Sequence, residues 1–197
     1  MSRALKSLGI FFAFVVIFTL SRHALSPSTT TTTTTSTPSA TSTTTTTTIA
    51  GSVSCTAADF RGVFNQGQGA AGTIYASVSL VKDTAGTCTL KGWPMLTLLD
   101  RTGAILHSTT IDLPTTNSPI RFPISQANAA PATLVLHNGS ETNFSLAYSD
   151  VPRGAEVCPS ATTLAVQLVQ NGSVVDVTAQ YPVQPCNNGA MWVSPFY

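Results

Sequence analysis

TIYASVSLV, residues 73–81, alternates apolar and polar side chains along almost its whole length. The apolar residues on its even-numbered side are Ile74, Ala76, Val78 and Leu80. Because successive side chains of a β-strand point to opposite faces, this period of two predicts a strand with one buried side. No window beyond residue 51 carries the i, i+3, i+4, i+7 stripe of an amphipathic helix, and TAADFRG at 56–62 offers one helical turn at most.

Similar runs continue along the chain and are separated by turn signals. The Asn-Gly pairs at 138–139 and 171–172 and the turn sequence at 100–103 lie between strand-like runs, and Asn-Gly in that setting is the strongest short-range hairpin cue. About seven to nine short strands at this spacing predict an all-β domain, an antiparallel β-sandwich of immunoglobulin-like architecture. The further runs are residues 94–100, 132–138, 143–149, 163–169 and 173–178.

Charge is scarce in this chain. Only 9% of residues are charged, whereas soluble domains average about 25%. The surface must therefore be covered by Thr, Ser, Asn and Gln, which suits a protein that faces the environment. No basic stripe is available to displace counterions from a phosphate backbone, so we expect no nucleic-acid partner.

The N-terminus has the layout of an export signal. Arg3 and Lys6 precede residues 7–21, which carry no charge. About fifteen apolar residues are short for a membrane span of about twenty, which favours a signal peptide, but Pro27 follows the best cleavage match and opposes cleavage. We expect residues 1–26 to form a hydrophobic helix, either a cleaved signal peptide or an uncleaved anchor that holds the membrane through residues 7–21.

Residues 27–51 consist mainly of Thr with Ser and Pro and have no apolar face to bury. We expect them to be a disordered stalk that spans on the order of 70 Å at about 3 Å per residue. Such tracts commonly accept O-linked sugars, and a bare flexible linker is the alternative. Residues 52–197 would then form a β-sandwich domain held away from a membrane.

The cysteines are even in number and contain no C-x-x-C pair, which opposes a zinc site. In an exported chain this pattern predicts two disulfides. Of the three possible connectivities we favour Cys55–Cys88 and Cys158–Cys186, because each closes a loop of about thirty residues within one half of the domain.

CTLKGWP, residues 88–94, predicts a structural corner in which Cys88 tethers a strand end to the start of the domain. Leu90 would point inward, Gly92 would allow a tight turn, and Trp93 would cover the open end of the core. Pro94 would fix φ where the next strand begins.

Together with an early cysteine and GQGAAGTIY at 67–75, this motif resembles a family of exported, mostly actinobacterial proteins catalogued as domain of unknown function 4232. That family has a C-x-L-x-G-Y-P-like motif after a glycine-containing strand start, and often a second cysteine pair near the C-terminus. This chain has Trp93 where Tyr is commoner. The resemblance covers roughly residues 54–186 and implies an exported location and a fold, but no activity.

Motifs for catalysis are missing from the sequence. G-x-S-x-G, H-E-x-x-H and a calcium loop are all absent, and GQGAAG leads into a strand and so lacks the helix N-terminus that binds phosphate. His107 and Asp100 could join a serine in a triad only on paper, and His137 has the parity of a solvent-facing residue. We expect no catalytic, cofactor or metal site, and no enzymatic activity.

The C-terminal MWVSPFY, residues 191–197, is rich in aromatic side chains. Trp192, Phe196 and Tyr197 could contact a ligand, or they could pack as a last edge strand over the sheet. Both interpretations stay open.

These features predict a secreted or envelope-displayed module without catalytic activity. It would bind, adhere or interact with an unknown extracellular or cell-wall ligand. An extracytoplasmic hydrolase is one alternative, which would require His107 or His137 within hydrogen-bond reach of a carboxylate and a serine. A carbohydrate-binding module is the other, which would require exposed, coplanar rings of Trp93 with Trp192 or Tyr197.

Overall fold

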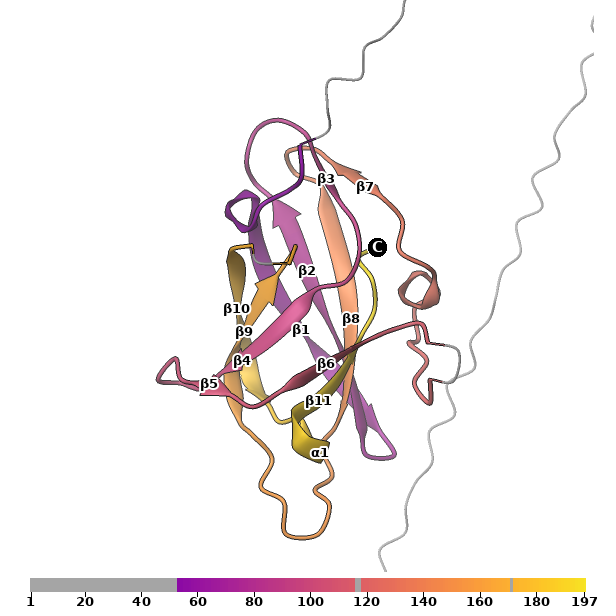
Figure 1. Ribbon diagram of the computed structural model, residues 1–197, viewed down its shortest axis with the longest axis vertical. Coiled ribbons are helices and arrows are strands. Elements are labelled where there is room, and N and C mark those ends of the chain that lie inside the picture. The colour runs from indigo at the N-terminus through magenta and orange to yellow at the C-terminus, as the bar shows by residue number, and fades with distance from the viewer. Residues whose placement is uncertain (1–52, 116–117, 171) are drawn as a thin grey trace, which may run out of the picture. The chain divides into compact units, whose positions relative to one another are not determined.

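The computed structural model describes residues 53–115, 118–170 and 172–197 (Figure 1). The predicted signal segment, stalk and N-terminal helix lie outside these residues. Within them, no helix has the length and apolar character needed to span a membrane.

The regular secondary structure of the described residues consists almost entirely of strands, which confirms the all-β prediction. Two single turns of 3-10 helix, η1 at Ala57–Asp59 and η2 at Gln126–Asn128, and a short helical segment, α1 at Cys186–Gly189, are the exceptions. The strands are β1 Phe60–Ala70, β2 Thr73–Lys82, β3 Cys88–Leu90, β4 Met95–Leu99, β5 Ile105–Leu106, β6 Thr109–Asp112, β7 Leu134–Leu136, β8 Glu141–Ser149, β9 Ala161–Gln167, β10 Val174–Val183 and β11 Ala190–Val193.

The strands form a five-stranded sheet in the order β1-β2-β8-β11-β6, a four-stranded sheet in the order β10-β9-β4-β5, and the pair β3-β7. Neighbouring strands are antiparallel except for β11 and β6, which run parallel. The predicted antiparallel pairing is therefore found at every pair of these strands except β11 and β6. The parallel pair arises because β11 enters between β8 and β6, running against β8 and along β6.

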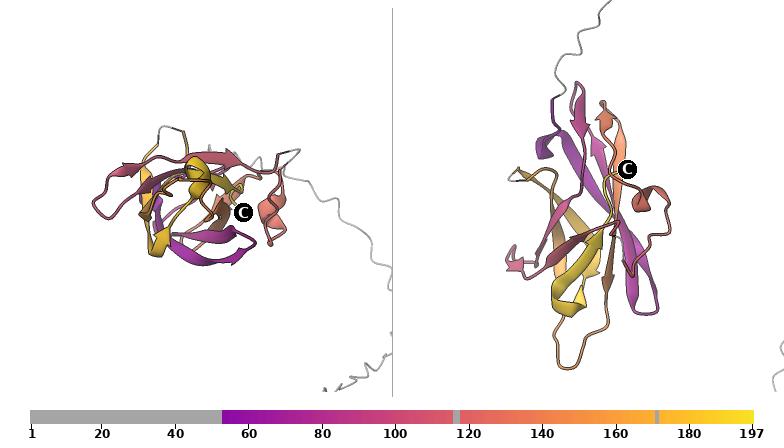
Figure 2. Two further views of the ribbon diagram at one scale, coloured as in Figure 1. Left: turned by 90° about the horizontal axis from the view of Figure 1, so that it is seen from below. Right: turned by 45° about the vertical axis from the view of Figure 1, so that its right-hand side comes forward.

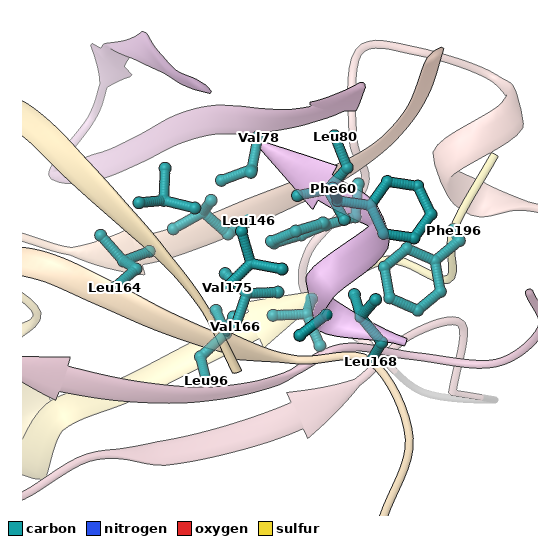
Figure 3. Packing of buried hydrophobic residues seen from close by; sticks show 14 of the residues in the cluster. Phe60, Val78, Leu80, Leu96, Leu146, Leu164, Val166, Leu168, Val175 and Phe196 are labelled. Carbon is teal, nitrogen blue, oxygen red and sulfur yellow. The ribbon is translucent and has the colours of Figure 1, made fainter. Parts of the chain in front are cut away.

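Both larger sheets contribute to one apolar core (Figure 3). In β2 the predicted alternation is confirmed, with Ala76, Val78 and Leu80 buried. Leu164 and Val166 of β9 lie in the same cluster, together with the buried residues of β4 and β10. This shared burial, rather than local propensity, holds the sheets together, since each fully buried Leu or Val side chain contributes roughly 1.5–3 kcal/mol.

Strand β8 is buried on both of its faces. Phe144, Leu146 and Tyr148 are buried as the parity predicts, but Ser145 and Ala147 on the opposite face are also buried. The cause is the covering segment, residues 118–129, whose apolar side chains pack on Ala147 in a second cluster. Figure 2 shows η2 of this segment on the outer side of the sheet, away from the four-stranded sheet.

Strand β1 was not predicted from the sequence, because GQGAAG was interpreted only as a segment that leads into the strand at 73–81. Residues 67–70 instead complete β1, and the turn to β2 falls at Ala71 and Gly72, which both have positive φ. The pairing of β1 with β2 shifts register between Asn65 and Gln68, as at a β-bulge. A Cβ at Gly62 would overlap Cγ2 of Val177, so this glycine lets β1 lie against β10.

Candidate functional site

The structure contains both predicted disulfides. Cys55–Cys88 has a Cα–Cα distance of 4.9 Å and joins the residues before η1 to β3. Cys158–Cys186 has a Cα–Cα distance of 4.6 Å and joins the approach to β9 to α1. The described chain contains no free cysteine, so its sulfur atoms serve to hold the fold.

The CTLKGWP motif forms a corner between β3 and β4. Leu90 is 1% exposed and faces the core, and Pro94 is buried directly before β4. Gly92 has φ of 105° and open space where a Cβ would stand, so the backbone conformation and not crowding requires glycine. Trp93 packs against the core and its Nε1 donates to the carbonyl of Leu113. The backbone carbonyl of Gly92 accepts a hydrogen bond from the Phe196 amide at 3.0 Å. The C-terminal segment is therefore also attached to this corner.

An ion pair between a buried lysine and a partly exposed aspartate lies at the C-terminal end of β2. Lys82 is 1% exposed, and its Nζ donates to the Thr84 hydroxyl at 2.6 Å and lies 3.7 Å from Oδ1 of Asp59. Hydrogen bonds lower the pKa of Asp59 to about 2, and the one from the Thr84 hydroxyl has the largest effect. The Thr56 backbone amide contributes next, and the charge of Lys82 contributes less. The Asp59 carboxylate is therefore ionised and fully engaged, which makes this cluster a structural clamp.

The histidines lie apart from any catalytic arrangement in the described residues. His137 is exposed as predicted, and its Nδ1 is 2.8 Å from the Thr87 hydroxyl. His107 is exposed near Glu156 and Asn188, beside the Cys158–Cys186 disulfide. Across residues 53–115, 118–170 and 172–197, neither imidazole hydrogen-bonds to a carboxylate, and no group of three or more His, Cys, Asp or Glu side chains converges as metal ligands would.

The C-terminal aromatic residues mainly pack. Phe196 is 2% exposed and meets Phe144 edge-on at a centroid distance of 5.9 Å, so it belongs to the core and offers no surface to a ligand. Trp192 is half-buried in the second cluster, whereas Trp93 packs on the main core, so the two rings lie in separate clusters. An edge strand was one of the two interpretations of this segment, but β11 lies inside the sheet because β6 pairs with its far side.

A cleft of about 260 Å³ lies on the outer face of the five-stranded sheet, between β1, β2 and the covering segment. We call it the outer cleft. Its lining residues come from β1, β2, β8 and the covering segment, and none of them is Asp, Glu, His, Lys or Arg. They are Asn65, Gln66, Gln68, Tyr75, Ala76, Ser77, Phe122, Pro123, Ile124 and Ser145.

The floor of the outer cleft includes Asn65 and Ser77, which belong to a row of hydrogen-bonded polar side chains that continues beyond the cleft. Asn65 donates through Nδ2 to Oγ of Ser79 at 3.0 Å and of Ser77 at 3.3 Å. Ser79 donates in turn to Oδ1 of Asn143 at 2.6 Å. Both hydrogens of the Asn65 amide are used in this way, so its carbonyl oxygen is oriented as an acceptor.

The wall of the outer cleft is fixed by one asparagine. Asn128 accepts from the Phe122 amide at 2.9 Å and donates through Nδ2 to the carbonyls of Phe122 at 2.8 Å and Ile124 at 3.0 Å. Phe122, held in this way, packs T-shaped on Tyr75 with ring centroids 6.4 Å apart. The aromatic part of the cleft is therefore preorganised before any ligand arrives.

Tyr197 connects the C-terminus to this face of the sheet. Its backbone pairs with Asn143, and its hydroxyl lies 2.8 Å from Oγ of Ser145, which lines the outer cleft. Of the aromatic residues predicted as possible ligand contacts, Tyr197 thus hydrogen-bonds to a residue that lines the cleft. The alternation in β2 indicates its polar side, but the covering segment carries no sequence signal, so the cleft could not be predicted.

The geometry suits binding of an uncharged partner. Amide and hydroxyl groups supply donors and acceptors, and the aromatic and aliphatic side chains supply apolar surface. The family model described as Domain of unknown function (DUF4232) matches residues 55–197. No curated protein and no solved structure matches the chain.

Proposed function

The chain belongs to the DUF4232 family, and from this premise we propose that it is a binding module without catalytic activity that works outside the cytoplasmic membrane. The outer cleft is its binding site. The observation that carries this proposal is a preorganised cleft whose lining has hydrogen-bonding and aromatic groups but no ionisable acid or base other than the tyrosine.

The proposed location follows from disulfides and sequence together. Two disulfides in one small domain are typical of an oxidising compartment. The apolar residues 7–21 behind a basic start are typical of export, and the Thr-rich residues 27–51 would serve as a stalk if the signal is retained as an anchor. The intact mass of the protein from its host tests this: a full-length mass in the soluble cytoplasmic fraction, with four free thiols, would contradict it.

We further propose that the two larger sheets form a sandwich of immunoglobulin-like architecture. Support comes from the single apolar cluster to which both sheets contribute. In this arrangement the outer cleft lies on the surface of one layer, where strands supply a rigid floor.

Binding through the outer cleft is tested with the full chain and envelope fragments of its host. Gln68 is exposed in β1 and lines the cleft, so Gln68→Arg fills the cleft and brings a charge into it with little effect on folding. Thr178→Arg, at an exposed position of β10, is the matched control. We expect Gln68→Arg to weaken retention by about tenfold or more and Thr178→Arg to leave it unchanged. Equal retention of both variants would refute the cleft as the binding site.

A further inference from the structure

We propose that the outer cleft binds a neutral saccharide, and this inference rests on the proposed binding function. The ligand would place hydroxyl groups on the polar floor and the C–H face of one sugar ring against Tyr75.

The lining of the outer cleft carries no charged side chain. Phosphate, sulfate and carboxylate groups are bound by Arg, Lys or helix N-termini in proteins. The lining of the outer cleft contains none of these, and it contains no carboxylate that would pair with a cationic ligand. An uncharged ligand therefore needs no partner that the lining lacks, whereas an ionic ligand would find no side chain of opposite charge there.

The amide side chains of the outer cleft match the hydroxyl groups of a sugar. A sugar hydroxyl both donates and accepts, and neighbouring hydroxyls match an amide that offers a carbonyl oxygen and an NH₂ group side by side. Gln66 and Gln68 are exposed at the cleft and supply such amides. Asn65 adds an oriented carbonyl oxygen, because its two amide hydrogens are used by Ser77 and Ser79.

The apolar side chains of the outer cleft match the C–H face of a sugar ring. Sugar rings carry a face of C–H groups, and these are attracted to the negative face of an aromatic ring. Tyr75 lines the cleft and is held in place by its T-shaped contact with Phe122. Ile124, which is 44% exposed, extends the apolar surface beside it.

Size limits the ligand to part of a chain of sugars. A volume of about 260 Å³ is somewhat below the roughly 300–1,000 Å³ of pockets that enclose a drug-sized molecule. The cleft thus accommodates one or two rings, with the rest of a glycan outside. Because so few rings make contact, we expect the saccharide to bind the single cleft weakly, with Kd on the order of 0.1–1 mM.

The probe is the neutral oligosaccharide fraction released from the host envelope, separated from the charged fraction by anion exchange. Binding to the full chain is followed by NMR chemical shifts and calorimetry. We expect saturable binding of the neutral fraction, with shifts at residues 65–68, 75–77 and 122–124. No saturation up to about 10 mM, or stronger binding of the charged fraction, would overturn the proposal.

Variants locate the contact. Gln68→Ala removes one amide and should weaken saccharide binding about 2- to 12-fold. Tyr75→Ala removes the ring and should weaken it by about tenfold. Tyr75→Phe preserves the packing on Phe122 and should retain most of the affinity, which keeps the test valid if Tyr75→Ala fails to fold. Tyr181→Ala, at an exposed tyrosine of β10, is the matched control and should bind like the wild type.

The two proposals fail in different ways. If Gln68→Arg abolishes envelope retention but no neutral saccharide binds or competes, the binding function stands and the saccharide is refuted. If a neutral saccharide binds but Gln68→Ala and Tyr181→Ala bind it equally, the cleft is refuted as its site.

Discussion

Asp59→Asn is expected to destabilise the domain by an amount that depends on pH. The Asp59 carboxylate accepts from the amide and hydroxyl of Thr56 and from the hydroxyl of Thr84, and it lies 3.7 Å from the buried ammonium of Lys82. Replacing the carboxylate by an amide weakens these bonds and leaves the Lys82 charge without its counterion. Removing one partner of a buried pair is destabilising because the remaining charge stays desolvated.

The magnitude follows from the pKa of Asp59, which is about 2 in the folded protein against an ordinary value of 3.8. Each unit of difference corresponds to about 1.4 kcal/mol, so the full linkage is about 2.5 kcal/mol. The Asp59 side chain is 22% exposed, and solvent screening reduces this to about 1–2 kcal/mol, or about 3–6 °C in Tm.

The sign is set by the lowered folded pKa. The ionised carboxylate stabilises the folded state at any pH above the unfolded pKa, and this contribution is lost as pH falls through 3.8 toward about 2. Urea unfolding at pH 7, 5, 3 and 2 measures it as the difference between wild type and Asp59→Asn, which should shrink by about half near pH 3. Asp176→Asn, at an exposed position of β10, is the control and should show no such trend. A difference between wild type and Asp59→Asn that is absent at pH 7, or that stays constant down to pH 2, would refute this account.

Two further predictions concern packing and the cleft wall. Gly62→Ala should lower the free energy of unfolding, measured in urea, by about 1–3 kcal/mol, because the new Cβ overlaps Val177. This loss should be smaller in a Val177→Ala background. Equal losses in both backgrounds would show that the overlap with Val177 is not the cause. Asn128→Ala should lower the free energy of unfolding by about 1–3 kcal/mol, because the Phe122 amide and the carbonyls of Phe122 and Ile124 lose their hydrogen-bond partner. Hydrogen exchange at the Phe122 amide should become faster for the same reason. Unchanged exchange at Phe122 would contradict the role of Asn128 in fixing the wall.

Much of the β-structure was predictable because it depends on local alternation. TIYASVSLV forms β2 with the expected buried side, and the loop-length argument gave the correct disulfide pairs. Strand β1 was not predictable in this way, because FRGVFNQGQGA contains three glycines that weaken its pattern. Tertiary contacts explain two of them: Gly62 permits the approach of β10, and a Cβ at Gly67 would overlap the carbonyl of Tyr75.

The candidate site was only half visible in the sequence. The outward parity of Tyr75 and Ser77 follows from the alternation in β2, so a polar outer face was implied. The covering segment has no period and no motif, and only the folded chain shows that it packs on Ala147 and brings Phe122 to Tyr75. A cleft formed by a loop over a sheet is a property of the tertiary structure.

The carboxyl groups whose pKa values are shifted differ in what surrounds them. A general base works best with a pKa near the working pH. Hydrogen bonds from Thr102 and nearby backbone amides lower the pKa of Asp100, so this carboxylate holds its own turn. The backbone amides of Asn188 and Arg153 lower the pKa of Glu156, so this carboxylate joins its loop to α1. Burial raises the pKa of Asp112, at the end of β6, but no histidine or serine of the described residues hydrogen-bonds to its side chain. The acidic groups with perturbed pKa values lie outside the outer cleft, so the recognition proposed there would depend on neutral hydrogen bonds and apolar contact.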